Sequence, residues 1–170
     1  EKVNSPERIP LGAGELYCGT PFSIMAGVTV ESGADSGLNI QPGFSANGEK
    51  GNEIVFTGSN PDPYIGCWGA AYGGIHSPAP RLKYCIVRFA NIGMTTSSLG
   101  ALIQNCLIEY NGYGIRPFWS GGQYLGAIIT RSTIRYNGFG IANDNANSFV
   151  FYNNIYGNTS WGDYAGNFQS

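Results

Sequence analysis

The sequence predicts an all-β protein, a right-handed, single-stranded parallel β-helix of about five to six coils. Its composition favours turns over helices, because Gly supplies 26 of 170 residues and charged residues only 12%. Gly and Asn are poor in helix interiors. The longest stretch without Gly or Pro is residues 141–156, and it has no apolar stripe at helical spacing. The second observation is an internal repeat.

Four segments of the chain repeat one pattern. They begin at Lys83, Gln104, Thr130 and Phe151, and their equivalent positions are 21, 26 and 21 residues apart. Two of them continue in step as Asn-Gly-aromatic-Gly-Ile, at 111–115 and 137–141. Identical turn sequences at a coil-length period are typical of a parallel β-solenoid.

Alternation along the repeated strands assigns their faces. Residues of one parity are expected to stack inside, with an aliphatic residue at the centre of each strand. This interior set is Val87, Ile108, Ile134 and Ile155, with Cys85, Cys106, Ser132 and Asn153 before them and Phe89, Tyr110 and Tyr136 after them.

The opposite parity places an alternating row of charges, Arg88, Glu109 and Arg135, on the outer face. Strands of neighbouring coils are about 4.8 Å apart, so opposite charges pair. The row is interpreted as an exposed ion-pair ladder in preference to a ligand patch.

The same register stacks Asn111, Asn137 and Asn158 at one turn. An asparagine at such a corner can bond the amide of the next coil, which predicts a ladder that satisfies the turn backbone.

The four cysteines leave two interpretations open. Cys85 and Cys106 stack at a separation that a disulfide tolerates, or they stay as buried thiols. If those two do not pair, Cys18 with Cys67 is the other pairing considered. No spacing resembles a zinc site and the only histidine is His76, so neither a metal nor a cofactor is expected.

The solenoid is expected over residues 23–160. Short strand-like runs separated by Gly, Pro or Asn turns extend it upstream of the clear repeats, from Val28 to Tyr72. The Pro-containing residues 1–22 are expected to form an irregular arm or cap, and the aromatic residues 161–170 a tail or cap.

The run from Ile40-Gln41-Pro42-Gly43 through Asn52-Glu53-Ile54-Val55-Phe56-Thr57, Cys67-Trp68-Gly69 and Leu82-Lys83-Tyr84-Cys85-Ile86-Val87 resembles the opening coils of secreted bacterial parallel β-helix proteins of the pectate-lyase-like superfamily. The resemblance covers about residues 24–158. In this chain Ala70-Ala71 replaces the aliphatic residue that follows Trp-Gly in those proteins. The superfamily includes enzymes, adhesins and structural surface proteins, so the resemblance implies a fold more than a function.

Charge and hydropathy exclude several partners. A net charge of −2 gives no footprint for nucleic acid, and no run of about 18 apolar residues predicts a membrane span. The chain opens on Glu1 without a basic and then apolar leader, which is interpreted as a mature, processed product or as a piece cut from a longer protein. The expected location is secreted, extracellular or at the cell surface. No paired carboxylates or nucleophile arrangement at the coil period indicate a catalytic site.

Three functions are weighed. The leading hypothesis is a non-enzymatic extracellular structural protein whose subunits stack head to tail into a fibre or surface layer. A second is a glycan-binding or adhesin module that uses Phe118, Trp119 and Tyr124 to contact a polysaccharide. A third is a small polysaccharide lyase-like enzyme that uses Arg88, Glu109 or Arg135.

Overall fold

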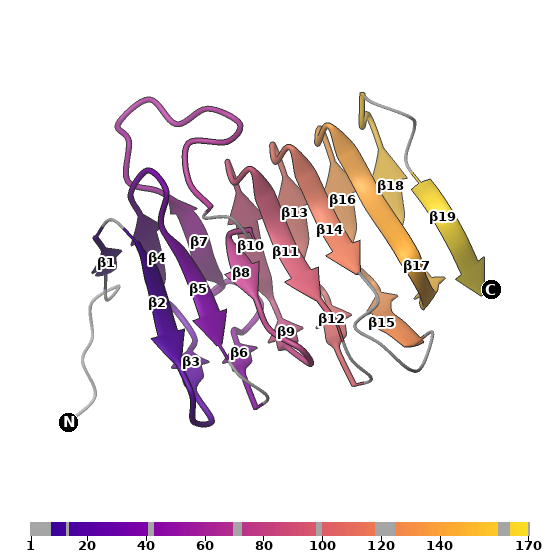
Figure 1. The fold of residues 1–170 in the computed structure, drawn as a ribbon, viewed down its shortest axis with the longest axis horizontal. Helices are drawn as coiled ribbons and strands as arrows, with labels where there is room; N and C mark the ends of the chain where they lie inside the picture. The colour runs from indigo at the N-terminus through magenta and orange to yellow at the C-terminus, as the bar shows by residue number, and fades with distance from the viewer. Residues whose placement is uncertain are drawn as a thin grey trace.

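A computed structural model describes residues 8–12, 14–40, 43–69, 73–97, 100–117, 125–159 and 164–169. Its described strands are stacked in parallel and wind into a β-solenoid of about six turns (Figure 1). Strands nearest the viewer run downward in Figure 1 and the chain returns upward on the far side while it advances from N to C, so the coil is right-handed. The predicted fold class is therefore confirmed.

Each complete coil contributes a strand to each of three ladders. The first ladder, called sheet A here, is one seven-stranded sheet. Its strands are β1 (Arg8–Leu11), β4 (Thr29–Ser32), β7 (Ile54–Gly58), β10 (Cys85–Arg88), β13 (Leu107–Glu109), β16 (Thr133–Arg135) and β18 (Asn154–Tyr156).

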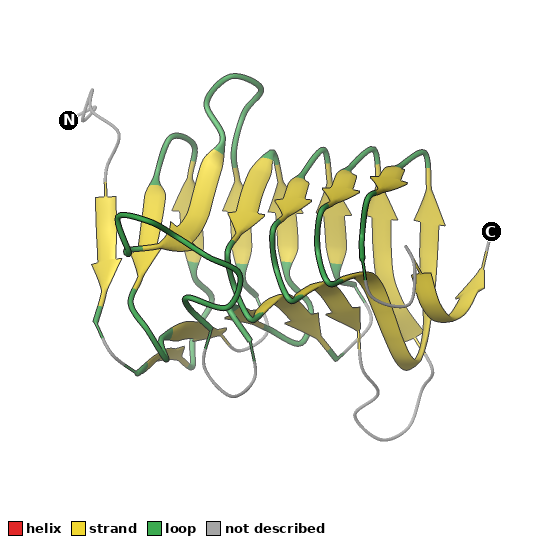
Figure 2. Cartoon of the chain, turned by 90° about the horizontal axis from the view of Figure 1, so that it is seen from above, coloured by secondary structure: helices red, strands yellow, loops and turns green. Residues whose placement is uncertain are grey.

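The other two ladders are joined by one long strand, β17 (Phe139–Phe151), into a single sheet. The second ladder also contains β2 (Glu15–Cys18), β5 (Gly37–Ile40), β8 (Ile75–His76), β11 (Ile92–Thr96), β14 (Tyr113–Pro117) and β19 (Tyr164–Gln169). The third contains β3 (Ser23–Met25), β6 (Ser45–Asn47), β9 (Arg81–Lys83), β12 (Leu102–Gln104) and β15 (Leu125–Thr130). Figure 2 shows the ladders enclosing a narrow interior.

The interior is filled by aliphatic columns that run along the solenoid axis. One column on sheet A follows the strand register through Ile9, Val30, Phe56, Val87, Ile108, Ile134 and Ile155. The five central members are at most 1% exposed. Alternating inward residues on successive strands therefore build one continuous core, as the period-two pattern predicts.

The ladders extend beyond the expected boundaries of the solenoid. β1 and β2 lie within the expected arm at 1–22, but they pair in parallel with β4 and β5. At the other end β19 lies within the expected tail at 161–170 and pairs with β17. Both segments continue the ladders because strand pairing depends on backbone register, which can be kept where the side-chain repeat is not evident.

The prediction that Tyr110 and Tyr136 lie inside is wrong. Their side chains are 38% and 41% exposed. Each directly follows a strand of sheet A and has a positive φ, 55° in both cases. A residue in the left-handed region turns the chain through the corner, so the two-residue alternation no longer holds there.

Candidate functional site

The most distinctive surface is the outer face of sheet A over β10, β13, β16 and β18. Two rows of outward side chains run along the solenoid axis. In-register pairing gives the first row as Ile86, Leu107, Thr133 and Asn154, and the second as Arg88, Glu109, Arg135 and Tyr156.

Residues in the left-handed region border this face on both sides. Before the strands they are Tyr84, Asn105, Arg131 and Tyr152, with φ between 48° and 58°. After the strands they are Phe89, Tyr110, Tyr136 and Gly157. Such φ values are uncommon for bulky side chains and cost about 1 kcal/mol or more each. Only Gly157 meets this geometry without strain.

The rings after the strands form a stack at the corner. The ring centroids of Phe89 and Tyr110 are 5.8 Å apart, and those of Tyr110 and Tyr136 are 5.4 Å apart. The guanidinium groups of Arg88 and Arg135 lie 5.5 and 5.3 Å from the rings of Phe89 and Tyr136. Stacking and cation–π contact offset part of the strain at these positions.

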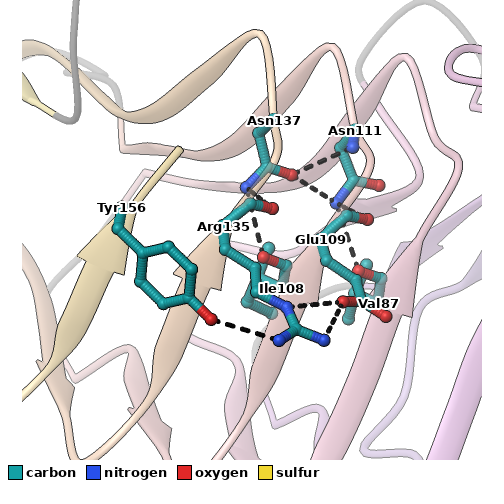
Figure 3. A network of polar contacts seen from close by, with 7 residues as sticks. All are labelled: Val87, Ile108, Glu109, Asn111, Arg135, Asn137 and Tyr156. Atoms are coloured by element: carbon teal, nitrogen blue, oxygen red, sulfur yellow. Dashed lines mark hydrogen bonds and ion pairs between the residues drawn. The ribbon is translucent and has the colours of Figure 1, made fainter. Parts of the chain in front are cut away.

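The charged row is not the exposed ladder that the sequence predicts. Glu109 is 7% exposed, and its Oε2 atom accepts hydrogen bonds from Nε and Nη2 of Arg135 at 2.9 and 2.8 Å (Figure 3). Arg135 also donates from Nη1 to the hydroxyl of Tyr156 at 3.1 Å. The pKa of Arg135 is raised, mainly by the hydrogen bond to Tyr156 and secondly by the one to Glu109, so the guanidinium stays charged. Nε of Arg88 is buried without a hydrogen-bond partner.

A groove of about 510 Å³ lies over this face. Its lining includes Ile86, Leu107 and Thr133 of the first outward row, and Tyr84, Asn105 and Arg131, which precede the strands. Arg135 and Tyr156 of the second row also line it, and the turn before β7 contributes Lys50 and Glu53. The groove thus crosses the strands and follows the axis over successive coils.

Asn111, Asn137 and Asn158 lie inside the corner behind this face (Figure 3 shows the first two). Oδ1 of Asn137 accepts from the backbone N and from Nδ2 of Asn111, at 2.9 and 3.0 Å. Oδ1 of Asn158 accepts in the same way from Asn137, at 2.9 and 3.0 Å. Nδ2 of Asn137 also donates to the carbonyls of Ile108 and Arg135. The amides of Asn111 and Asn137 therefore each link three coils.

Asn158 also begins an Asn-Thr-Ser glycosylation sequon. Its Nδ2, the atom that glycosylation modifies, donates to the carbonyl of Ile134 at 3.2 Å. A sugar attached to this nitrogen would displace the last step of the ladder.

The corner before sheet A carries a second, shorter ladder that the sequence analysis did not identify. Oγ of Ser132 accepts from the backbone N of Cys106 at 3.1 Å, and Oδ1 of Asn153 accepts from the backbone N of Ser132 at 2.8 Å. The inward parity of these positions was the available signal, because a small polar residue facing the core requires a partner.

The same corner holds the stacked thiols of Cys85 and Cys106. All four cysteines are among the described residues and all are free, so the structure contains neither the Cys85–Cys106 nor the Cys18–Cys67 disulfide. The pKa of the Cys85 thiol is raised, mainly by a hydrogen bond to Cys106 and secondly by burial. Of the two alternatives left open by the sequence, this is the stacked-thiol arrangement.

His76 lies on the second ladder, away from the groove. Nδ1 is 2.7 Å from the hydroxyl of Thr95. Burial lowers the pKa of His76 below 6.5, partly opposed by the charge of Glu15.

Three further points concern the aromatic segment, metal ligands and membrane spans. Phe118, Trp119 and Tyr124 lie outside the described residues. Over the part of the chain that the structure describes, no three or more His, Cys, Asp or Glu side chains gather as a metal site. Within the same part, no helix has the length and hydropathy needed to cross a membrane.

The fold and this outer face define the chain as a parallel β-solenoid with a grooved sheet. Comparisons with family models, with curated proteins and with solved structures found no match to it.

Proposed function

We propose that the chain is a non-enzymatic, extracellular structural protein whose solenoids stack head to tail into a fibre or surface layer. The resemblance of its repeats supports a place among the secreted bacterial parallel β-helix proteins of the pectate-lyase-like superfamily. Neither assignment depends on a catalytic group, and Glu109 is already engaged by Arg135 in a two-point ion pair.

The observation that carries the proposal is the state of the core column at its two ends. Ile9 in β1 and Ile155 in β18 pack against the core but are only partly buried, unlike the five residues between them. Among the described strands of sheet A, β1 and β18 have a neighbour on one side only. Edge strands of this kind pair readily with another chain.

Stacking one copy on the next continues the existing geometry. β18 of one copy and β1 of the next are parallel when the solenoids are aligned. Ile9 of the second copy would then continue the core column directly after Ile155 of the first. Such a contact is heterologous and does not close, and therefore generates a filament.

The test uses two variants that each block one end, Ile9→Lys and Ile155→Lys. A buried lysine without a partner is costly, so each variant alone is expected to remain monomeric in sedimentation velocity, while wild-type protein forms filaments in negative-stain microscopy. The control is Asn154→Lys, on the same strand as Ile155 but exposed on the outer face, which should still assemble.

An equimolar mixture of the two blocked variants distinguishes head-to-tail stacking from other association. Each variant keeps one intact end, so the mixture should form heterodimers and nothing longer. Wild-type protein that stays monodisperse at every concentration, or a mixture that forms no heterodimer, would overturn the proposal.

A further inference from the structure

We propose that the outer face of the third ladder docks on an anionic lipid surface. This face, called the third face here, is formed by β3, β6, β9, β12 and β15 and by the last residues of β17, and these strands lie along the lower side of the view in Figure 1. The inference goes beyond the proposed assembly, because the third face lies on the side of the solenoid and not at its ends.

The strand register assigns two outward rows to the third face. The residues between the two rows are buried and face inward, so their neighbours on each strand point outward. The inward residues are Ile24, Ala46, Leu82, Ile103 and Ile129. One outward row is Ser23, Ser45, Arg81, Leu102, Ile128 and Phe149, and the other is Met25, Asn47, Lys83, Gln104, Thr130 and Phe151.

The C-terminal part of the third face is apolar and exposed. Ile128 and Phe149 are in-register neighbours, each 40% exposed, and Phe151 is 43% exposed. Tyr152 follows directly and is 81% exposed, and its ring centroid is 5.6 Å from that of Phe151. Single exposed hydrophobic residues are ordinary, but these four side chains lie within two coils and form a contiguous patch, which marks an interaction surface.

The adjoining part of the third face is cationic. Arg81 and Lys83 are both exposed on β9, and the register places Arg81 two coils, about 10 Å, from Ile128. Neither cation forms an ion pair with a described carboxylate. The two outward rows contain no Asp or Glu, although the whole chain has a net charge of −2. The local charge of this face is therefore opposite in sign to that of the chain.

An anionic membrane surface is complementary to both parts of the face. It presents negatively charged headgroups above an apolar layer. Exposed Phe and Ile side chains enter the boundary between headgroups and acyl chains, while Lys and Arg remain beside the headgroups. Tyrosine favours the same boundary, because its ring is apolar and its hydroxyl is polar. The third face thus offers the two kinds of contact that peripheral lipid binding uses.

Other partners fit this face less well. Two third faces placed against each other would bring four cations together without a carboxylate, and like charges across an interface are unfavourable. Nucleic acid is bound through many phosphate contacts, whereas the two rows contain only Arg81 and Lys83 as cations. A lipid surface needs fewer charges, because apolar insertion contributes to its binding.

The experiment is flotation of the full chain with lipid vesicles in a density gradient. One set of vesicles contains phosphatidylserine and phosphatidylcholine in equal amounts, and the other contains phosphatidylcholine alone. We expect the chain to float with the anionic vesicles and to bind the neutral vesicles at least about tenfold more weakly. Filaments sink in the absence of lipid, so this measurement is separate from the test of end-to-end assembly.

Two substitutions test the cations. Arg81→Gln and Lys83→Gln are each expected to weaken binding to the anionic vesicles about fivefold, the contribution of one charge near such a surface. The matched control is Arg8→Gln, which removes one positive charge from an exposed position on β1 of sheet A. Its binding should equal that of the wild type.

A third substitution tests the apolar patch. Phe149→Ser is expected to weaken binding to the anionic vesicles about tenfold, because it removes an apolar ring that would enter the lipid. The matched control is Ile65→Ser, since Ile65 is exposed in the turn between β7 and β8, away from the third ladder. Both replaced side chains are exposed, so neither substitution opens a cavity in the core.

Each remaining outcome overturns the inference. Absence of flotation with both kinds of vesicle removes the lipid partner. Equal flotation with the neutral vesicles would mean that Arg81 and Lys83 do not contribute. Losses with Arg8→Gln or Ile65→Ser equal to those of the third-face variants would place the lipid contact elsewhere on the chain.

Discussion

The two corners that flank sheet A solve the same problem with different side chains. The corner after the strands repeats asparagine, at 111, 137 and 158, whereas the corner before them changes from Cys85 and Cys106 to Ser132 and Asn153. An amide both donates and accepts, so every asparagine step links neighbouring coils. The thiols donate to the carbonyls of Lys83 and Gln104, two residues earlier in the chain, and Cys85 also donates to the carbonyl of Ala46 on the preceding coil.

Both corners form hydrogen bonds between coils, but the corner after the strands does so through one repeated side chain, and the corner before them through a thiol, a hydroxyl and an amide. The corner after the strands depends on polar contacts that must all be present, and the other depends partly on packing. Substitutions at each corner test this contrast.

The largest effect is expected for Asn137→Ala. The buried side chain of Asn137 contacts Asn111, Ile108 and Arg135, and its loss leaves several buried groups unsatisfied. We expect the free energy of unfolding in urea to fall by about 3 kcal/mol. The control is Ser132→Ala at the other corner, with an expected loss of about 1 kcal/mol. Equal losses would remove the difference between the corners.

The ion pair of Glu109 with Arg135 lies beside the asparagine corner and should contribute less. Arg135 is partly exposed, with 32% of its side chain accessible, so solvent screening reduces the pair's value. A double-mutant cycle with Glu109→Gln and Arg135→Met is expected to give a coupling energy of about 1 kcal/mol. A coupling near zero would show that the contact with Tyr156, and not the ion pair, holds Arg135.

Thiol chemistry tests the other corner. Cys85 and Cys106 are 1% and 3% exposed, and the pKa of Cys85 is raised. A thiol reagent at mildly alkaline pH should therefore leave both unmodified in folded protein, as read by peptide mass spectrometry. In denaturant without reductant all four cysteines should react. If only two react, a disulfide is present and the stacked-thiol arrangement is incorrect.

The smallest effect concerns pH and should come from neither corner. Asn and Ser do not titrate, whereas the pKa of His76 is lowered in the folded protein. The unfolded chain then binds more protons, so the stability from neutral His76 is complete above pH 6.5 and is lost as pH falls from 6.5 through the lower pKa of the folded state. His76→Gln should flatten this part of the curve. A slope that persists in the variant would assign it to another group.

The sequence predicted those parts of the structure in which each coil repeats a residue type for the same physical reason. Stacked Ile108 and Ile134, and the asparagines at one turn, follow from period-two alternation and from the need to satisfy turn backbone. The outward turn of Tyr110 and Tyr136 could not be read in this way, because no pattern of hydrophobicity marks a positive φ at a tyrosine.

The groove was also beyond sequence reasoning. Its lining comes from five coils, and Lys50 lies outside the four aligned repeats. Nothing in the local sequence relates Lys50 to Arg131. Only the coil register brings them to one face.

The unequal spacing of the coils has an evolutionary consequence. Among the four aligned repeats, the coils related by 21 residues and the one related by 26 keep the same register on sheet A. The five extra residues lie between the start of β14 and the end of β15. Positions 92, 113 and 139 are equivalent in three successive coils, and so are 104, 130 and 151. The segment 113–130 is five residues longer than either 92–104 or 139–151. Lineages can therefore lengthen or replace this connection without altering either corner, so new surface can be acquired at one edge while the scaffold is inherited unchanged.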